Sequence, residues 1–174
     1  VMMKEISEQI TNDKITHIIL QSGVGGMAAA MIAGLARYFD YVPKIIIVEP
    51  ENAACVYQSI KTGMIEKISI KKESIMGGMS CEEVSLVPWE ILKNSVNYCV
   101  TISDDYISKT VKYLFNSKLS GEKIIGGECS TPGIISLITM YNDTKIKDIV
   151  GLNENSNLLL FGCEGDADEE LYQK

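Results

Sequence analysis

Residues 15–27 read ITHIILQSGVGGM, and this stretch decides the fold. Its first half, Ile15–Gln21, is a compact run of apolar and β-branched residues, which predicts a strand buried on both faces. Ser22–Gly26 is a glycine turn, and Met27–Phe39 is rich in alanine, methionine and leucine, which predicts a helix. A strand, a glycine turn and a helix in this order are typical of a parallel α/β unit.

The same alternation continues after this unit. Further strands are expected at Lys44–Glu49 (ended by Pro50), Ile65–Ile70 (half-exposed), Tyr98–Ile102 and Leu158–Phe161. Further helices are expected at Ala53–Lys61 (ended by Gly63), Trp89–Ser95, Ser103–Phe115 and Thr131–Tyr141, with a short acidic helix after Gly165. Without a repeat or a linker, residues 1–174 are interpreted as a single α/β domain with three layers and a mostly parallel sheet.

Composition excludes several classes of function. The net charge is −7 and no basic stripe is present, so nucleic acid is not an expected partner. No apolar run approaches the roughly 18 residues of a membrane span, and the first residues lack the apolar core of a signal peptide. The five cysteines form no C-x-x-C pair, which argues against a metal site and favours reduced thiols in the cytoplasm.

The glycine turn Ser22–Met27 has the features of an anion cradle. A helix start leaves backbone N–H groups unpaired at the positive end of the helix dipole. Glycines let the backbone approach a phosphate closely, and Ser22 can add a hydroxyl donor. The loop has no lysine, so we expect N–H dipoles to meet the phosphate charge. A tight turn with no ligand is the plainer interpretation.

The same residues also satisfy a second pattern. Gly23-x-Gly25-x-x-Ala28 matches the Rossmann-like dinucleotide fingerprint, with Glu49 at the position of a ribose-binding acid. Glu49 is equally interpreted as a structural acid at a strand end. A dinucleotide-binding domain of an oxidoreductase or regulatory module therefore stays open as an alternative.

Further segments in a fixed order separate these interpretations. With the glycine loop, they resemble fold-type II pyridoxal-phosphate enzymes, which include threonine and serine dehydratases, and most of all the diaminopropionate ammonia-lyases. The resemblance runs from about Thr16 to the end of the chain. Its segments are Ile47–Pro50, Ala54–Ser59, Ser74–Cys81, Trp89–Leu92, Gly127–Ser130 and Gly162–Asp166.

The resemblance implies a lyase with a small amino-acid substrate. Diaminopropionate ammonia-lyases convert 2,3-diaminopropionate to pyruvate and ammonia by α,β-elimination, with pyridoxal 5′-phosphate as the electron sink. A serine- or threonine-dehydratase activity is the alternative within the same group. The resemblance also implies a homodimer.

Positions that match the family motifs are the predicted cofactor-binding residues. The loop would bind the phosphate, Gly78 and Met79 would pass beside the ring, Glu128 would line the same cavity, and Cys163 would face the pyridine nitrogen. The full set is Ser22, Gly23, Val24, Gly25, Gly26, Met27, Gly78, Met79, Glu128 and Cys163. Cys55 and Cys81 would lie on the cofactor side, as two free thiols or as a conditional disulfide.

One family feature is missing from the chain. The Schiff-base lysine of the family follows Ser or Thr and an aromatic residue, upstream of the glycine loop, and no such motif occurs in this sequence. We therefore expect a C-terminal fragment: part of the large domain, with part of the cofactor site and no catalytic residue.

Overall fold

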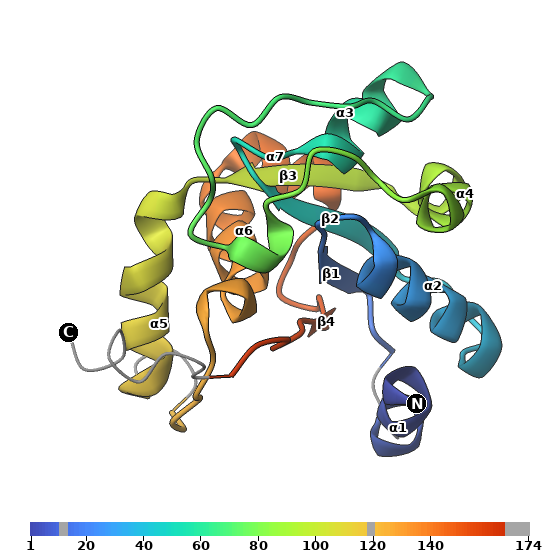
Figure 1. The fold of residues 1–174 in the computed structure, drawn as a ribbon. Helices are drawn as coiled ribbons and strands as arrows, with labels where there is room; N and C mark the ends of the chain where they lie inside the picture. Colours follow the sequence, from blue (N-terminus) through green and yellow to red (C-terminus); the bar gives the residue numbers. More distant parts are fainter. Residues whose placement is uncertain (11–13, 118–120, 166–174) are drawn as a thin grey trace.

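The computed structural model describes residues 1–10, 14–117 and 121–165, which form a three-layer α/β arrangement (Figure 1). Its sheet has the strand order β3-β2-β1-β4, and every adjacent pair is parallel. The strands are β1 (His17–Gln21), β2 (Lys44–Pro50), β3 (Tyr98–Ile102) and β4 (Leu158–Leu159). The predicted parallel sheet is therefore confirmed.

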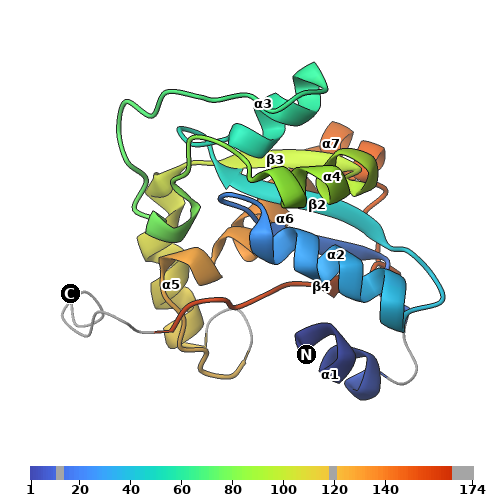
Figure 2. The ribbon, with the colours of Figure 1, turned by 45° about the vertical axis from the view of Figure 1, so that its right-hand side comes forward.

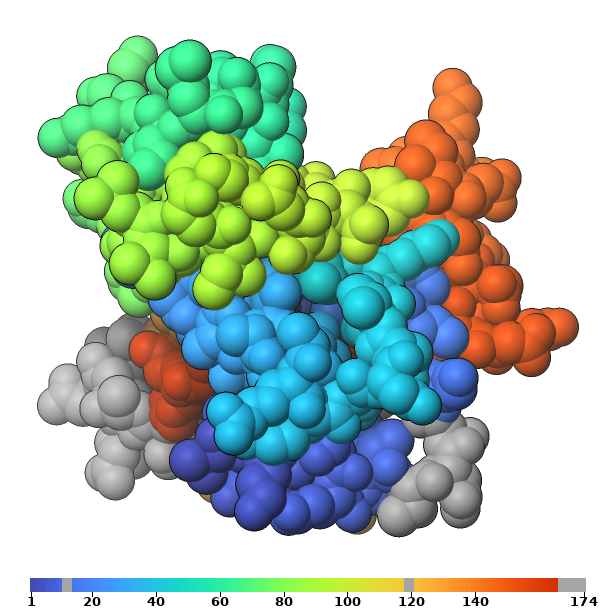
Figure 3. Space-filling model, turned by 90° about the vertical axis from the view of Figure 1, so that its right-hand side faces the viewer, coloured from blue at the N-terminus to red at the C-terminus, as the bar shows by residue number. Residues whose placement is uncertain are grey.

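Helices cover both faces of the sheet. One face carries α1 (Met2–Gln9), α2 (Gly26–Tyr38), α3 (Cys55–Thr62) and α4 (Leu86–Ser95). The other face carries α5 (Ile107–Phe115), α6 (Pro132–Asn142) and α7 (Thr144–Val150). Figure 3 shows α4, α2 and α1, in lime, light blue and dark blue, lying one below another over the first face.

Alternate residues of the central strands enter two separate cores. Ile18 and Leu20 pack on the side of α2, whereas Ile19 and Ile46 pack on the side of α6. All four side chains are fully buried. Since both faces of the sheet are covered, the interiors of β1 and β2, Ile18–Leu20 and Ile45–Val48, are apolar at successive positions and do not alternate.

The predicted boundaries hold at several turns. Gly63 ends α3 in the left-handed conformation, with φ of 78°. The Ser103 side chain accepts a hydrogen bond from the backbone N–H of Asp105 at the start of a short 3₁₀ helix, η2 (Asp104–Tyr106), that leads into α5. Pro50 was expected to follow β2, but it is the last residue of this strand. Proline has no N–H to donate, and the N–H of the next residue, Glu51, donates to the carbonyl of Ile102 in β3.

One expected strand is absent, and one helix was not expected. Residues 65–70 form no strand: Ile68 donates its backbone N–H to Glu82, outside the sheet, while Ile65 and Ile68 pack against the first core. The apolar alternation there reflects one-sided packing of an extended segment. In contrast, α7 was not predicted, although Asp143 caps it and Gly151 ends it. The short acidic helix expected after Gly165 lies outside the described residues.

Candidate functional site

A cavity of about 320 Å³ lies at the carboxyl ends of the strands. Four segments meet there: the glycine loop, η1 (Gly77–Met79), η3 (Glu128–Ser130) and the chain after β4. Figure 2 shows these segments gathered on one side of the sheet, next to the start of α2. The lining residues are Gln21, Ser22, Gly23, Val24, Gly25, Gly26, Met27, Gly78, Met79, Cys129, Cys163 and Glu164.

The glycine loop presents unused hydrogen-bond donors. The backbone N–H of Ser22 is bonded to the carbonyl of Val48, and that of Ala29 to the carbonyl of Gly25. Between them, the N–H groups from Gly23 to Met27 donate to no acceptor in the described part of the chain. They lie at the start of the 13-residue helix α2. Unpaired donors at the positive end of a helix dipole form a site for an anion.

Glycine is required at two positions of this loop. Gly25 has φ of +90°, and a methyl group there would lie 2.8 Å from Cδ1 of Leu92. A methyl group at Gly23 would lie 2.8 Å from Sγ of Cys81. A methyl group at Gly26 would meet no atom within 4 Å, so the backbone there borders open space.

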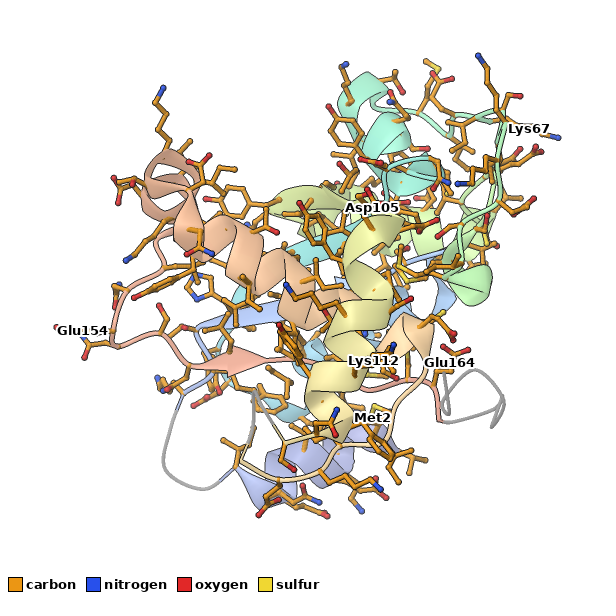
Figure 4. All side chains as sticks on the ribbon, turned by 90° about the vertical axis from the view of Figure 1, so that its left-hand side faces the viewer. Met2, Lys67, Asp105, Lys112, Glu154 and Glu164 are labelled. Atoms are coloured by element: carbon orange, nitrogen blue, oxygen red, sulfur yellow. The ribbon has the colours of Figure 1, made fainter. Side chains whose placement is uncertain are left out.

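Two thiols and a carboxylate form the other end of the cavity. The Sγ of Cys163 donates to the carbonyl oxygen of Cys129 at 3.1 Å, and the N–H of Cys129 donates to Oε2 of Glu164 at 2.7 Å. Figure 4 shows Glu164 on the chain that leaves β4. The pKa of Cys163 is raised, mainly by partial burial and secondly by the charge of Glu164. Burial raises the pKa of Cys129 to about 12. Both groups are therefore neutral thiols near pH 7.

Most of the predicted cofactor-binding residues meet at this cavity. The wall includes Ser22 through Met27, Gly78, Met79 and Cys163. Glu128 is the exception: it is half-buried at the start of η3, where its carbonyl accepts from Oγ1 of Thr131 at 2.9 Å, and it is not on the wall.

Three wall residues were not predicted as site residues. Gln21, Cys129 and Glu164 come from a strand end, η3 and the segment after β4. Gln21 stands next to the loop but was assigned only to a strand. The motif segments contained Cys129 and Glu164, and only the fold shows that their groups meet.

Glu49 is a structural acid. It is fully buried, with Oε1 accepting from the N–H of Val56 at 2.9 Å and Oε2 from the N–H of Tyr57 at 2.8 Å. Burial raises its pKa to about 7, against the lowering effect of these bonds. The side chain caps α3, is fully buried and is not on the cavity wall, so it is not placed to meet a ribose hydroxyl there. This geometry speaks against the dinucleotide interpretation.

The cysteines near the loop are free thiols. Cys55 lies with its Sγ 3.6 Å from the carbonyl oxygen of Gly23, and Cys81 borders the same glycine. Neither takes part in a disulfide. Among the described residues, no three His, Cys, Asp or Glu side chains are grouped as metal ligands, and no helix has the length and apolar character needed to cross a membrane.

Comparison with known proteins agrees with this geometry. A family model described as "Pyridoxal-phosphate dependent enzyme" matches residues 1–133. The chain belongs to this family.

Relatives within the family include diaminopropionate ammonia-lyases. That of Escherichia coli K12 is 30% identical over 165 residues, which are 91% of this chain and 41% of that protein. That of Salmonella typhimurium is 27% identical over 179 residues, which are 97% of this chain and 44% of that protein. The crystal structure of the holo enzyme from E. coli matches with a TM-score of 0.79 and 28% identity over 99% of this chain and 42% of that one. The chain thus spans less than half the length of these relatives.

The residues present fit the family's cofactor. A phosphomonoester needs several converging donors and close backbone approach, and the loop from Gly23 to Met27 supplies both. The second end of the cavity carries two neutral thiols and the Glu164 carboxylate beside η1, and these groups give it a polar lining.

Proposed function

We propose that this chain belongs to a pyridoxal-phosphate-dependent lyase that converts 2,3-diaminopropionate to pyruvate and ammonia by α,β-elimination. One observation carries the proposal: the row of unpaired N–H groups from Gly23 to Met27 that opens into the cavity. The likeness to diaminopropionate ammonia-lyases over nearly the whole chain supports the choice of substrate.

The loop has the role of binding the phosphate. N–H groups of Gly23, Val24, Gly25, Gly26 and Met27 donate to its oxygens, and the dipole of α2 adds a favourable field. The loop contains no lysine, so peptide dipoles replace a cation. Ser22 supports the loop, because its hydroxyl donates to the carbonyl of Gly23 at 3.3 Å.

The far end of the cavity has the role of holding the ring. When bound, pyridoxal phosphate supplies an electron sink for the charge that develops on the substrate Cα. Gly78 and Met79 would lie beside the ring, and Cys163 would face its nitrogen. Because a thiol is neutral near pH 7 and the pKa of Cys163 is raised further, the nitrogen would be less fully protonated there than in direct contact with a carboxylate. We infer that this favours elimination over transamination.

The remaining catalytic groups lie outside this chain in the proposed enzyme. Residues 1–174 form part of its large α/β domain, and the Schiff-base lysine and the other catalytic residues belong to a preceding segment. The whole enzyme is proposed to be a cytoplasmic homodimer. The free thiols of the described residues fit a reducing compartment.

The test is product stoichiometry in the whole protein, with its Schiff-base lysine present. Supplied with pyridoxal phosphate and diaminopropionate, the protein is expected to absorb in the visible region and to release two ammonia per pyruvate. One ammonia per pyruvate from serine, with no turnover of diaminopropionate, would establish a dehydratase. A colourless protein that binds a nicotinamide dinucleotide would overturn the proposal.

A further inference from the structure

Gln21 is the last residue of β1 and directly precedes the glycine loop. Its side chain is 3% exposed, and the residue is part of the cavity wall. The amide Nε2 donates to the carbonyl oxygen of Phe161 at 2.6 Å and to that of Cys129 at 3.1 Å. Because both partners are carbonyls that can only accept, they fix which way the amide points.

The carbonyl of Cys129 is shared with the predicted ring partner. It accepts from Nε2 of Gln21 and from Sγ of Cys163, each at 3.1 Å. A carbonyl oxygen has two lone pairs, so it can accept both bonds. The strand that carries the phosphate loop is therefore joined through one oxygen to the thiol at the opposite end of the cavity.

The other bonds at this end do not reach β1. Ser130 Oγ and the N–H of Gly127 both donate to the carbonyl of Glu164, at 2.6 Å and 3.1 Å. These bonds join η3 to the segment after β4. The ladder between β1 and β4 ends at the pair Ile18 and Leu159. Among the described residues, the Gln21 amide is the side chain that ties both segments to the end of β1.

The unused atom of Gln21 supports a specific role. Its Oε1 is buried and has no hydrogen-bond partner in the described part of the chain. An unpaired buried acceptor lowers stability, so a side chain needed only to fill space would be better apolar. The two bonds from Nε2 are therefore the reason for an amide at this position.

We propose, resting on the proposed function, that Gln21 is a positioning residue that fixes the Cys129 carbonyl and so holds the Cys163 thiol in register with the phosphate cradle. Gln21 then affects recognition of the cofactor ring and leaves recognition of phosphate unchanged. A loss of affinity for the ring without a loss of affinity for phosphate, called the split below, distinguishes a positioning role from a general contribution to folding.

Two probes test the split on the chain of residues 1–174. Inorganic phosphate reports on the loop, and 4′-deoxypyridoxine 5′-phosphate adds the ring but has no aldehyde, so it needs no Schiff-base lysine. In Gln21→Met we expect affinity for the ring-bearing probe to fall about tenfold, the effect of losing a buried hydrogen bond. Affinity for inorganic phosphate, measured by calorimetry, is expected to stay the same.

A second variant and a control complete the binding test. Gln21→Leu is also uncharged and lacks both donors, so it is expected to show the same split at pH 7.5. Gln9→Met, on the exposed part of α1, is expected to change neither affinity. Equal losses for both probes, or unchanged ring affinity in both Gln21 variants, would overturn the proposal.

The thiol gives a readout that needs no cofactor. Alkylation of Cys163 by iodoacetamide, followed by peptide mass spectrometry, is expected to be faster in Gln21→Met because Sγ loses its fixed acceptor. An unchanged rate would remove the link between Gln21 and Cys163. If the unsubstituted chain binds neither probe, the proposed phosphate cradle fails, and the alkylation rate still decides the role of Gln21.

Discussion

Gly23 and Gly78 approach each other so closely that a methyl group at Gly23 would lie 2.7 Å from the carbonyl oxygen of Gly78. This contact brings the phosphate loop against η1. The spacing between these two sides of the cavity therefore depends on Gly23 having no side chain. Backbone lies on both sides of the contact, and a substitution there must move one of the two segments.

Gly23→Ala is therefore expected to damage both stability and binding. Overpacking of this kind costs about 1–3 kcal/mol, to be measured by urea denaturation, and displacement of the loop is expected to abolish binding of inorganic phosphate. Gly77→Ala is the matched control, because a methyl group there meets no atom within 4 Å. Normal phosphate binding by a folded Gly23→Ala protein would contradict the close approach of the two glycines.

The glycine loop could be predicted because its signals are local. A buried strand, the turn and the helix follow one another within Ile15–Phe39, and each has its own sequence pattern. The predicted parallel sheet follows from strands whose interiors are apolar at successive positions, such as Ile45–Val48. A strand was wrongly predicted at residues 65–70 because alternation of apolar and polar residues indicates only that one face of a segment is buried. A strand also needs a neighbouring strand with which to form hydrogen bonds.

The rest of the site depends on contacts between distant residues. Gln21 meets carbonyls 108 and 140 positions further along the chain. No local pattern distinguishes a glutamine that donates to such partners from a polar residue at a strand end. Glu164 was likewise predicted only as part of the segment Gly162–Asp166, although its Oε2 accepts from the N–H of Cys129.

Glu49 is expected to give the protein a distinct pH dependence of stability. Its pKa rises from 4.5 to about 7 on folding, so between these values the folded state holds a proton that the unfolded state has lost. The free energy of unfolding therefore falls as pH rises through this window, by about 3 kcal/mol in total. Denaturation of the unsubstituted protein and of Glu49→Gln at pH 5, 6, 7 and 8 measures this slope.

The difference between the two proteins isolates Glu49. His17 titrates nearby in pH, but burial lowers its pKa, so its contribution to stability rises with pH and opposes that of Glu49. This contribution is present in both proteins and cancels. Parallel stability curves would show that the Glu49 carboxylate ionises normally.

Asp104 is expected to hold η1 in place. Its carboxylate accepts from Oγ of Ser74 at 2.6 Å and from the N–H of Ile75 at 3.2 Å, just before the segment that lines the cavity. Asp104→Ala should lower stability by about 1 kcal/mol and speed amide hydrogen exchange at Met79, whose N–H is bonded to Met76.

Its neighbour Asp105 provides the control. Asp105 is exposed on η2, where Figure 4 shows it at the upper end of α5. Among the described residues, the hydrogen bonds to Ser74 and Ile75 come from the carboxylate of Asp104 and not from that of Asp105. Asp105→Ala is therefore expected to leave exchange at Met79 unchanged. Equal acceleration in both variants would mean that Asp104 acts only through its charge.

Cys163→Asp is expected to change the electronic state of the cofactor in the whole protein. A carboxylate beside the ring nitrogen stabilises its protonated form and should raise its pKa by about 1–3 units, whereas the neutral thiol does not. The shift is measured from the nitrogen-15 resonance of labelled pyridoxal phosphate across pH, and slower pyruvate release is expected with it. Cys163→Ser keeps a neutral partner and is expected to keep the resonance of the unsubstituted protein. If the aspartate variant also keeps that resonance, Cys163 does not face the ring nitrogen, and the thiol at 3.1 Å from the Cys129 carbonyl is only a packing group of the cavity wall.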